Sequence, residues 1–229
     1  MATERAEIIE AEALVDDKPL VLLDIDGVLN AYEHAYADDE TPSWDDYQKK
    51  YVELPDDMVK LFGYHHGTGY HITWSPSLTE RIRRLSLSDE VDVVWLTSWN
   101  QFANHLANVC FWPDEKSPIR NFLDTDSHGF NPRYTIQKYM QTRDVLVARA
   151  RAGVDAPVVN VDDEGIHVRS HAERMLELSS KYPDAYEPDE WRMAMDAPYT
   201  AIAPNPMFGI TPSQMDAIEK AVGFNRTTS

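Results

Sequence analysis

Short apolar runs recur along the chain, and between them apolar residues repeat at the spacing of an amphipathic helix. Four runs have the length and composition of strands, and the first three are apolar enough to be buried on both faces. They comprise residues 20–25, 91–96, 157–163 and 199–203. Helical spacing is clear at Leu78, Ile82 and Leu85, and a capping box at Thr211 starts a last helix. Strands that alternate with helices predict a three-layer, Rossmann-like α/β fold with a mainly parallel sheet and helices on both faces.

Two segments fall outside this alternation. Residues 1–17 are polar and acidic, and we expect them to form a lead-in to a single domain that spans residues 18–229. Residues 31–74 fit no repeating α/β pattern, so we expect a small insertion that leaves the main sheet and returns to it. Within the insertion, the glycines of Gly67-Thr68-Gly69 predict a hairpin over residues 64–74.

Charge and composition restrict the classes of function. Acidic residues outnumber basic ones by 39 to 21, and the net charge of −18 argues against binding long nucleic acid. Cys110 is the single cysteine, so no intramolecular disulfide can form. No apolar run reaches membrane-spanning length, and residues 1–17 are too acidic and polar for a signal peptide. We therefore expect a globular, cytoplasmic protein with no membrane partner, and the sequence indicates no protein partner.

The first three predicted strands all end in polar side chains that suit catalysis. These are Asp24 and Asp26, Thr97 and Ser98, and Asp162 and Asp163. In an open α/β sheet, ligands bind beyond the carboxyl ends of the strands, so we expect these groups to surround one crevice. Four carboxylates in one crevice need a counter-charge. Mg²⁺ fits, because it binds through few carboxylates together with substrate phosphate.

The spacing of Asp24 and Asp26 suggests how such a site would work. Alternate residues of a strand share a side, so both carboxylates can reach the same ligand. One carboxylate can attack phosphorus while the other handles the proton of the leaving group. Phosphoryl transfer needs little beyond such positioning and charge neutralisation.

These segments resemble the motifs of the haloacid dehalogenase (HAD) superfamily. The segment 24–30, Asp-Ile-Asp-Gly-Val-Leu-Asn, is similar to motif I. The segment 93–98 resembles motif II, and 158–163 resembles motif IV in its paired-aspartate form. The resemblance implies an HAD fold, with the insertion as a small flap or cap.

Within the superfamily, the chain is most similar to the small HAD domains related to RNA-repair "Swiss army knife" modules. Those domains share a motif II flanked by tryptophans, here Trp95 and Trp99, followed by Ala-Asn. They also share a late Gly-Ile-Thr before the last helix, here at 209–211. The resemblance spans about residues 20–223.

The resemblance assigns roles to the four carboxylates. Asp24 would attack phosphorus and also ligate Mg²⁺. Asp26 would protonate the leaving oxygen and then activate water, and its backbone carbonyl would touch the metal. Asp162 would complete the metal shell, and Asp163 would bind the metal through water or orient a lysine.

Two further roles are each open between two residues. Thr97 would hydrogen-bond the phosphoryl oxygens, and Ser98 is the alternative because the strand end is fixed only to within a residue or two. Lys138 would neutralise the phosphate and the nucleophile, and Lys116 is its rival. Lys138 is favoured because it falls in the first turn of a helix starting near Thr135, where the helix N-terminus already attracts phosphate.

These features predict a Mg²⁺-dependent phosphomonoester hydrolase that acts through an aspartyl-phosphate. The insertion is too small for a large lid, and Trp99 suits stacking on a flat ring. We therefore expect a nucleotide or another small phosphomonoester as the substrate. A polynucleotide-end phosphatase or a phosphotransferase of the same fold is the alternative, and a non-catalytic Mg²⁺- or phosphate-binding module is the alternative from another class.

Overall fold

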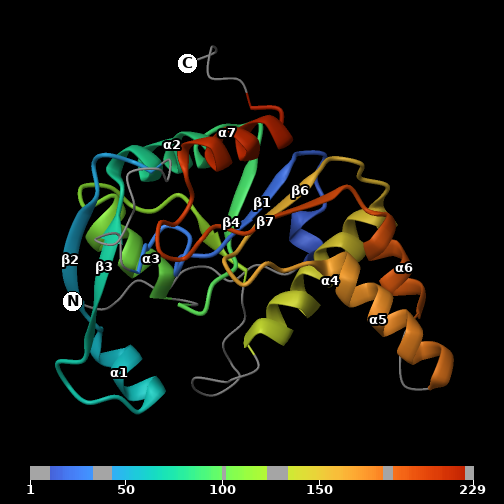
Figure 1. Ribbon diagram of the computed structural model, residues 1–229, viewed down its shortest axis with the longest axis horizontal. Coiled ribbons are helices and arrows are strands. Elements are labelled where there is room, and N and C mark those ends of the chain that lie inside the picture. Colours follow the sequence, from blue (N-terminus) through green and yellow to red (C-terminus); the bar gives the residue numbers. More distant parts are fainter. Residues whose placement is uncertain (1–10, 33–42, 100–101, 123–133, 183–187, 225–229) are drawn as a thin grey trace.

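The computed structural model describes residues 11–32, 43–99, 102–122, 134–182 and 188–224 (Figure 1). A five-stranded sheet in the order β5-β4-β1-β6-β7 runs through its centre, and every neighbouring pair of strands is parallel. The strands are β1 (Leu20–Leu23), β4 (Asp92–Trp95), β5 (Arg120–Asn121), β6 (Val158–Val161) and β7 (Tyr199–Ile202). The prediction of an α/β fold with a mainly parallel sheet is confirmed.

The central strands are apolar throughout because each face of the sheet supports its own core. All four residues of β1 are buried, and so are all four of β6. Val21 and Leu23 join one hydrophobic core, whereas Leu20 and Leu22 join the other. Alternate residues of a strand point to opposite faces, so a strand covered on both sides cannot show polar alternation.

Helices cover both faces of the sheet (Figure 1). The first face carries α2 (Pro76–Ser86), α3 (Ala103–Leu106), a π-helical turn (Ala107–Phe111) and α7 (Pro212–Ala221). The second face carries α4 (Tyr134–Ala152), α5 (Val168–Lys181) and α6 (Pro188–Asp196). Among the described residues, none of the helices is both long and apolar enough to cross a membrane.

Local signals in the sequence fix several helix ends. The Ser75 side chain accepts a hydrogen bond from the Leu78 backbone N–H, and Thr211 forms the predicted capping box with Gln214. Helix α4 ends at Ala152, directly before Gly153, as predicted. It begins at Tyr134, within one residue of the predicted start near Thr135.

The predicted hairpin over residues 64–74 is wrong in its pairing. Strand β3 (Gly69–Trp74) pairs antiparallel with β2 (Gln48–Glu53), and helix α1 (Asp56–Phe62) lies between them in the chain. Five of the six β2 residues are exposed, so the strand lacks the apolar alternation that would have revealed it. The two strands form a separate sheet beside the main one (Figure 1).

Part of the predicted lead-in packs against the domain. A short 3-10 turn, Ala11–Leu14, lies against α4, and Leu14 is fully buried in the second core. The Arg149 guanidinium donates to the backbone carbonyls of Leu14 and Lys18, at 2.7 and 2.6 Å. Residues 1–10 of the lead-in lie outside the described residues.

The loop after β7 braces the loop after β1. The Ile210 backbone N–H donates to the Val28 carbonyl at 2.9 Å, and the Tyr32 N–H donates to the Pro206 carbonyl at 2.9 Å. Gly209 has a φ of 68°, and a Cβ at this position would overlap the Val28 carbonyl oxygen. A glycine is therefore required here both by the backbone conformation and by the close approach of two loops.

Replacing Gly209 with alanine is expected to destabilise the fold more than the same change at Gly153. Gly153 has a φ of 75° but nothing lies within 4 Å of an added Cβ. Gly153→Ala therefore measures the cost of the left-handed conformation alone, about 1–2 kcal/mol. Gly209→Ala should cost clearly more in free energy of unfolding, measured by urea denaturation. Equal losses would show that the two loops do not depend on this contact.

Candidate active site

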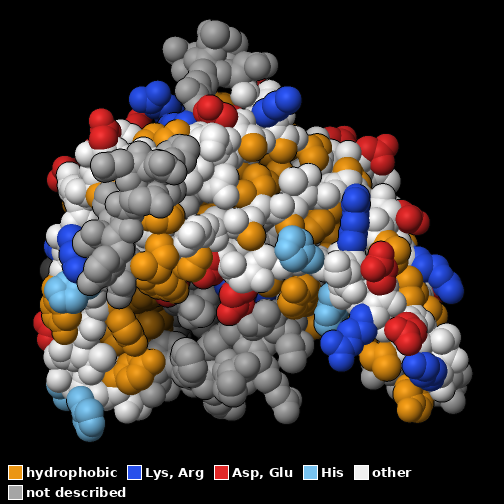
Figure 2. All heavy atoms as spheres, in the orientation of Figure 1, with side chains coloured by type: hydrophobic (Ala, Val, Ile, Leu, Met, Phe, Trp, Pro, Cys, Tyr) orange, Lys and Arg blue, Asp and Glu red, His pale blue; other side chains and the backbone are white. Residues whose placement is uncertain are grey.

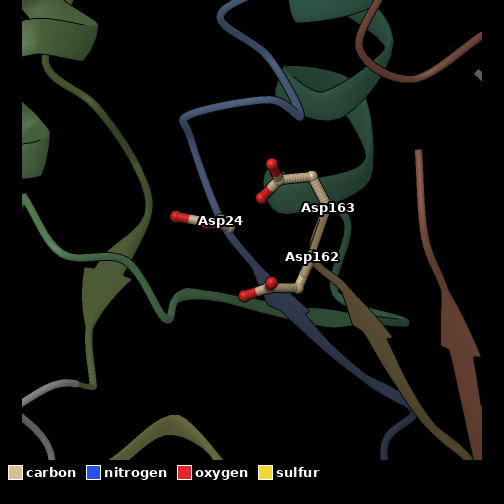
Figure 3. A group of neighbouring side chains, drawn as sticks. All are labelled: Asp24, Asp162 and Asp163. Carbon is tan, nitrogen blue, oxygen red and sulfur yellow. The ribbon is translucent and has the colours of Figure 1, made fainter. Parts of the chain in front are cut away.

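The carboxyl ends of β1 and β6 bring three carboxylates together. Asp24 directly follows β1, and its backbone N–H continues the ladder by donating to the Val161 carbonyl at 3.0 Å. Asp162 and Asp163 directly follow β6. Oxygen atoms of Asp24, Asp162 and Asp163 all lie within 4.8 Å of one another, and the three side chains extend to the same side of the strand ends (Figure 3).

A buried lysine joins two of these carboxylates. The Nζ atom of Lys138 lies 2.7 Å from Oδ2 of Asp24 and 2.7 Å from Oδ2 of Asp162. Only 4% of Lys138 is exposed, so this ammonium is nearly removed from water. Lys138 stands on α4, and α4 is tied to β6 through Thr142, whose hydroxyl accepts from Asn160 at 3.1 Å.

The structure differs from the sequence prediction in where the lysine sits on its helix. Lys138 is the fifth residue of α4 and so lies just past the first turn, not in it. It therefore acts through its own charge. Lys116 is exposed on the loop that carries Glu115, which pairs with Arg83 of α2. Of the two candidate lysines, Lys138 is the one that the structure places among the carboxylates.

One ammonium does not neutralise three carboxylates. Burial, followed by the charge of Asp24, raises the pKa of Asp162 to about 7 and that of Asp163 to about 6. Burial alone would lower the pKa of Lys138, but the Asp24 and Asp162 carboxylates raise it above its ordinary value. Lys138 thus stays charged, and Asp162 and Asp163 lose their protons at a higher pH than they would in water. Such a cluster of oxygen ligands suits a hard divalent cation, which would supply the missing positive charge.

Asp26 is held apart from this cluster by two hydrogen bonds. Its Oδ1 accepts from the Asn30 side-chain amide at 2.8 Å, and its Oδ2 accepts from the Trp99 indole N–H at 2.9 Å. Burial raises the pKa of Asp26, and the nearby charge of Asp24 adds to the rise, although both hydrogen bonds oppose it. A carboxyl of raised pKa next to a nucleophile is suited to donating a proton.

The Trp99 side chain is nearly buried and packs against a neighbouring aromatic ring. It is only 5% exposed, and its ring packs edge-on against Tyr70 with 5.7 Å between ring centroids. Its indole N–H is committed to Asp26. The structure gives Trp99 a role that the sequence did not suggest, as a hydrogen-bond donor that holds Asp26. Contact of Trp99 with a substrate ring stays a prediction.

Asn30 is a site residue that the sequence reasoning did not single out. Its amide binds Asp26, and its Oδ1 accepts from the Thr73 backbone N–H at 2.9 Å. One side chain thus connects Asp26 to strand β3. The signal was present, because Asn30 ends the motif I segment four residues after Asp26, but nothing in the spacing alone reveals the second contact.

The two motif II hydroxyls lie beyond the end of β4. Thr97 is fully buried, and its hydroxyl accepts a long 3.4 Å hydrogen bond from the Trp99 backbone N–H. Ser98 is half-buried. The assignment of a phosphoryl contact to Thr97, with Ser98 as the alternative, stays a prediction.

Comparison with known proteins identifies the family. Residues 20–182 match the model of the HAD domain in Swiss Army Knife RNA repair proteins. Neither a curated protein nor a solved structure matches the chain. The matched segment includes the whole cluster described above. It ends at residue 182, short of the 223 that the sequence motifs suggested, so the loop containing Gly209 and helix α7 lie beyond it.

Mg²⁺ is expected to stabilise this protein more at pH 8 than at pH 5. The folded-state pKa values of Asp162 and Asp163, about 7 and about 6, exceed the ordinary value. Such groups contribute stability that is fully present below the unfolded pKa of about 3.9 and is lost as pH rises through the folded value. A cation binds the deprotonated ligands, so it recovers stability where the protons have left.

Calorimetry with and without Mg²⁺ at several pH values measures this effect. The rise in Tm caused by Mg²⁺ should grow between pH 5 and pH 8, and Asp163→Asn should reduce it. A rise that is independent of pH would contradict the assignment of the metal to these carboxylates.

Proposed function

Because the chain belongs to the family of HAD domains in Swiss Army Knife RNA repair proteins, we propose that it is a Mg²⁺-dependent phosphomonoester hydrolase. Membership of this family supports a hydrolase of the phosphatase type. One observation carries the proposal: Lys138 contacts Asp24 and Asp162 while Asp163 lies within the same cluster. In the proposed mechanism these residues are the nucleophile, the lysine that neutralises the phosphate, and the metal ligands, and they lie together at the carboxyl ends of β1 and β6.

In the proposed reaction, Asp24 is the nucleophile. One carboxylate oxygen of Asp24 attacks phosphorus and forms an acyl-phosphate, as the bond to the leaving oxygen breaks. Asp26 gives its proton to that oxygen, so an alcohol departs. Asp26, now a carboxylate, takes a proton from water as the water attacks phosphorus, and the bond to Asp24 breaks to release phosphate.

The other residues hold charge in place during these steps. Asp24, Asp162 and Asp163 would hold Mg²⁺, with the Asp26 backbone carbonyl as a further ligand. When bound, Mg²⁺ supplies positive charge that neutralises phosphoryl oxygens. Lys138 shields the charge of Asp24 from that of an incoming phosphate. Thr97 or Ser98 would hydrogen-bond a phosphoryl oxygen.

The proposed substrate is a mononucleotide or another small phosphomonoester. The net charge of −18 disfavours a long phosphate backbone at the protein surface. A polynucleotide end is the second candidate, favoured by the RNA repair proteins for which the family is described. Both candidates use the same chemistry and differ in what lies beyond the reacting phosphate.

A panel of phosphate esters assayed with Mg²⁺, Ca²⁺ or a chelator tests the proposed activity. We expect phosphate release with Mg²⁺ and none in chelator. Ca²⁺ should bind but inhibit, because it takes more ligands at longer distances and can draw both oxygens of Asp24 away from attack. Full activity in chelator would contradict the proposal.

Asp24→Asn is expected to abolish turnover while the protein still folds, because it keeps the volume and removes the attacking charge. It also weakens the buried pair with Lys138, which keeps Asp162 as its partner, so a lower Tm is expected. Asp26→Asn should lower kcat by about 10²–10⁴-fold, the usual worth of general acid–base help. Asp196→Asn, on α6, is the matched control and should keep full activity. Thermal denaturation of each variant checks the fold, and near-normal turnover by Asp24→Asn would exclude the nucleophile assignment.

The substrate class is tested by comparing a nucleoside monophosphate with a 3′-phosphorylated oligonucleotide at two salt concentrations. An enzyme for small esters should prefer the mononucleotide at both. Preference for the oligonucleotide that weakens steeply as salt rises would favour the polynucleotide end, because released counterions set that slope.

A further inference from the structure

Two exposed tyrosines flank the residues that hold Asp26. Tyr32 is 50% exposed and follows the motif I loop, and Tyr70 is 41% exposed and lies on β3. Large apolar side chains with this exposure are uncommon on the described surface. Figure 2 shows hydrophobic side chains beside the two-stranded β2–β3 sheet. Acidic side chains lie near the centre of the same face.

The Tyr32 backbone is hydrogen-bonded to the loop after β7, and the Tyr32 phenol is affected by the charges of the site carboxylates. Its backbone N–H donates to the Pro206 carbonyl at 2.9 Å. Burial of part of the side chain, followed by the charges of Asp26 and Asp163, raises the pKa of Tyr32. The phenol therefore stays neutral and lies near both carboxylates.

Tyr70 reaches the site through Trp99. The two rings meet edge-on at 5.7 Å with an interplanar angle of 78°, and the Trp99 indole donates to Asp26 at 2.9 Å. Burial, followed by a hydrogen bond with Tyr64, raises the pKa of Tyr70 to about 12. A single ring thus separates Asp26 from the exposed ring of Tyr70.

The position of Asp26 determines which part of a substrate meets these tyrosines. In the proposed reaction Asp26 protonates the leaving oxygen, so the leaving group must extend outward from Asp26. Among the described residues, the two exposed side chains that flank the Asp26 contacts are aromatic and neutral, while the carboxylates beside them disfavour a second phosphate. A flat, neutral ring is the group that fits such a rim.

We propose that Tyr32 and Tyr70 bind the ring of the leaving group, so that the site selects phosphomonoesters carrying a nucleobase or a similar flat ring. This proposal rests on the proposed function and assigns the ring contact to two exposed residues, whereas Trp99 is nearly buried. The ring can belong to a mononucleotide or to the terminal nucleotide of a longer strand.

A matched pair of substrates isolates the ring. A nucleoside 5′-monophosphate and ribose 5-phosphate share the ester and the sugar, and only the first carries a base. Tyr32→Ala and Tyr70→Ala should each raise KM for the nucleotide by about fivefold or more, because stacking on one aromatic ring is worth about 1–3 kcal/mol per base. For Tyr32→Ala, the KM for ribose 5-phosphate and both kcat values should change little. Tyr70→Ala also removes the ring packed on Trp99, so its effect on ring binding is judged by the ratio of the two KM values in that variant.

Two further variants make the result specific. Tyr32→Phe should keep the low KM, because the ring and not the hydroxyl makes the contact. Tyr182→Ala is the matched control, since Tyr182 is 59% exposed at the far end of α5. A short oligonucleotide with a terminal phosphate, assayed in the same variants, distinguishes the two sources of the ring. An equal rise in its KM supports the same contact with a strand end.

The possible results distinguish failure of the ring contact from failure of the proposed hydrolase activity. Equal KM values for the two small esters in the wild type, or equal rises for both in the variants, would overturn the ring contact and leave the hydrolase intact. Hydrolysis of neither ester, nor of the oligonucleotide, would overturn the proposed function and this proposal with it.

Discussion

The ammonium of Lys138, buried between Asp24 and Asp162, is the interaction around which this site is organised. It forms because β1 and β6 are neighbours in the sheet and because α4, packed on one face of that sheet, brings Lys138 to their carboxyl ends. Burying a charge is costly unless it is paired, and removing one partner of a buried pair typically costs about 3–5 kcal/mol. The pairing therefore ties the two strand ends and the helix to one geometry, and that geometry leaves an excess of negative charge for a metal to balance.

A second set of contacts holds Asp26 at its own position. Asn30 connects Asp26 to β3, Trp99 reaches it from beyond β4, and the loop around Gly209 supports the turn on which it stands. These segments are far apart in the sequence. The proposed nucleophile and the proposed acid are thus supported by different parts of the fold, which allows their chemical environments to differ although only one residue separates them.

The sequence predicted well what depends on local pattern. Continuous apolar runs located β1, β4 and β6, and the acids that follow β1 and β6 located the carboxylate cluster, because parallel strands place their carboxyl ends together. Contacts between distant segments were harder to predict. The exposed strand β2 has no apolar alternation that would reveal it. The packing of Trp99 involves Tyr70, which lies on β3 and is distant from Trp99 in the sequence. The expected helix start near Thr135 favoured Lys138 over Lys116, but only the folded chain shows its two partners.

The central claim is that Asp24 is the residue that becomes phosphorylated. A crystal structure grown with Mg²⁺ and beryllium fluoride, which mimics a phosphoryl group on a carboxylate, tests this most directly. The account predicts the fluoride complex on a carboxylate oxygen of Asp24, close to Lys138 and with a metal ion on Asp162. An unmodified Asp24, with the complex or the metal bound elsewhere, would contradict it.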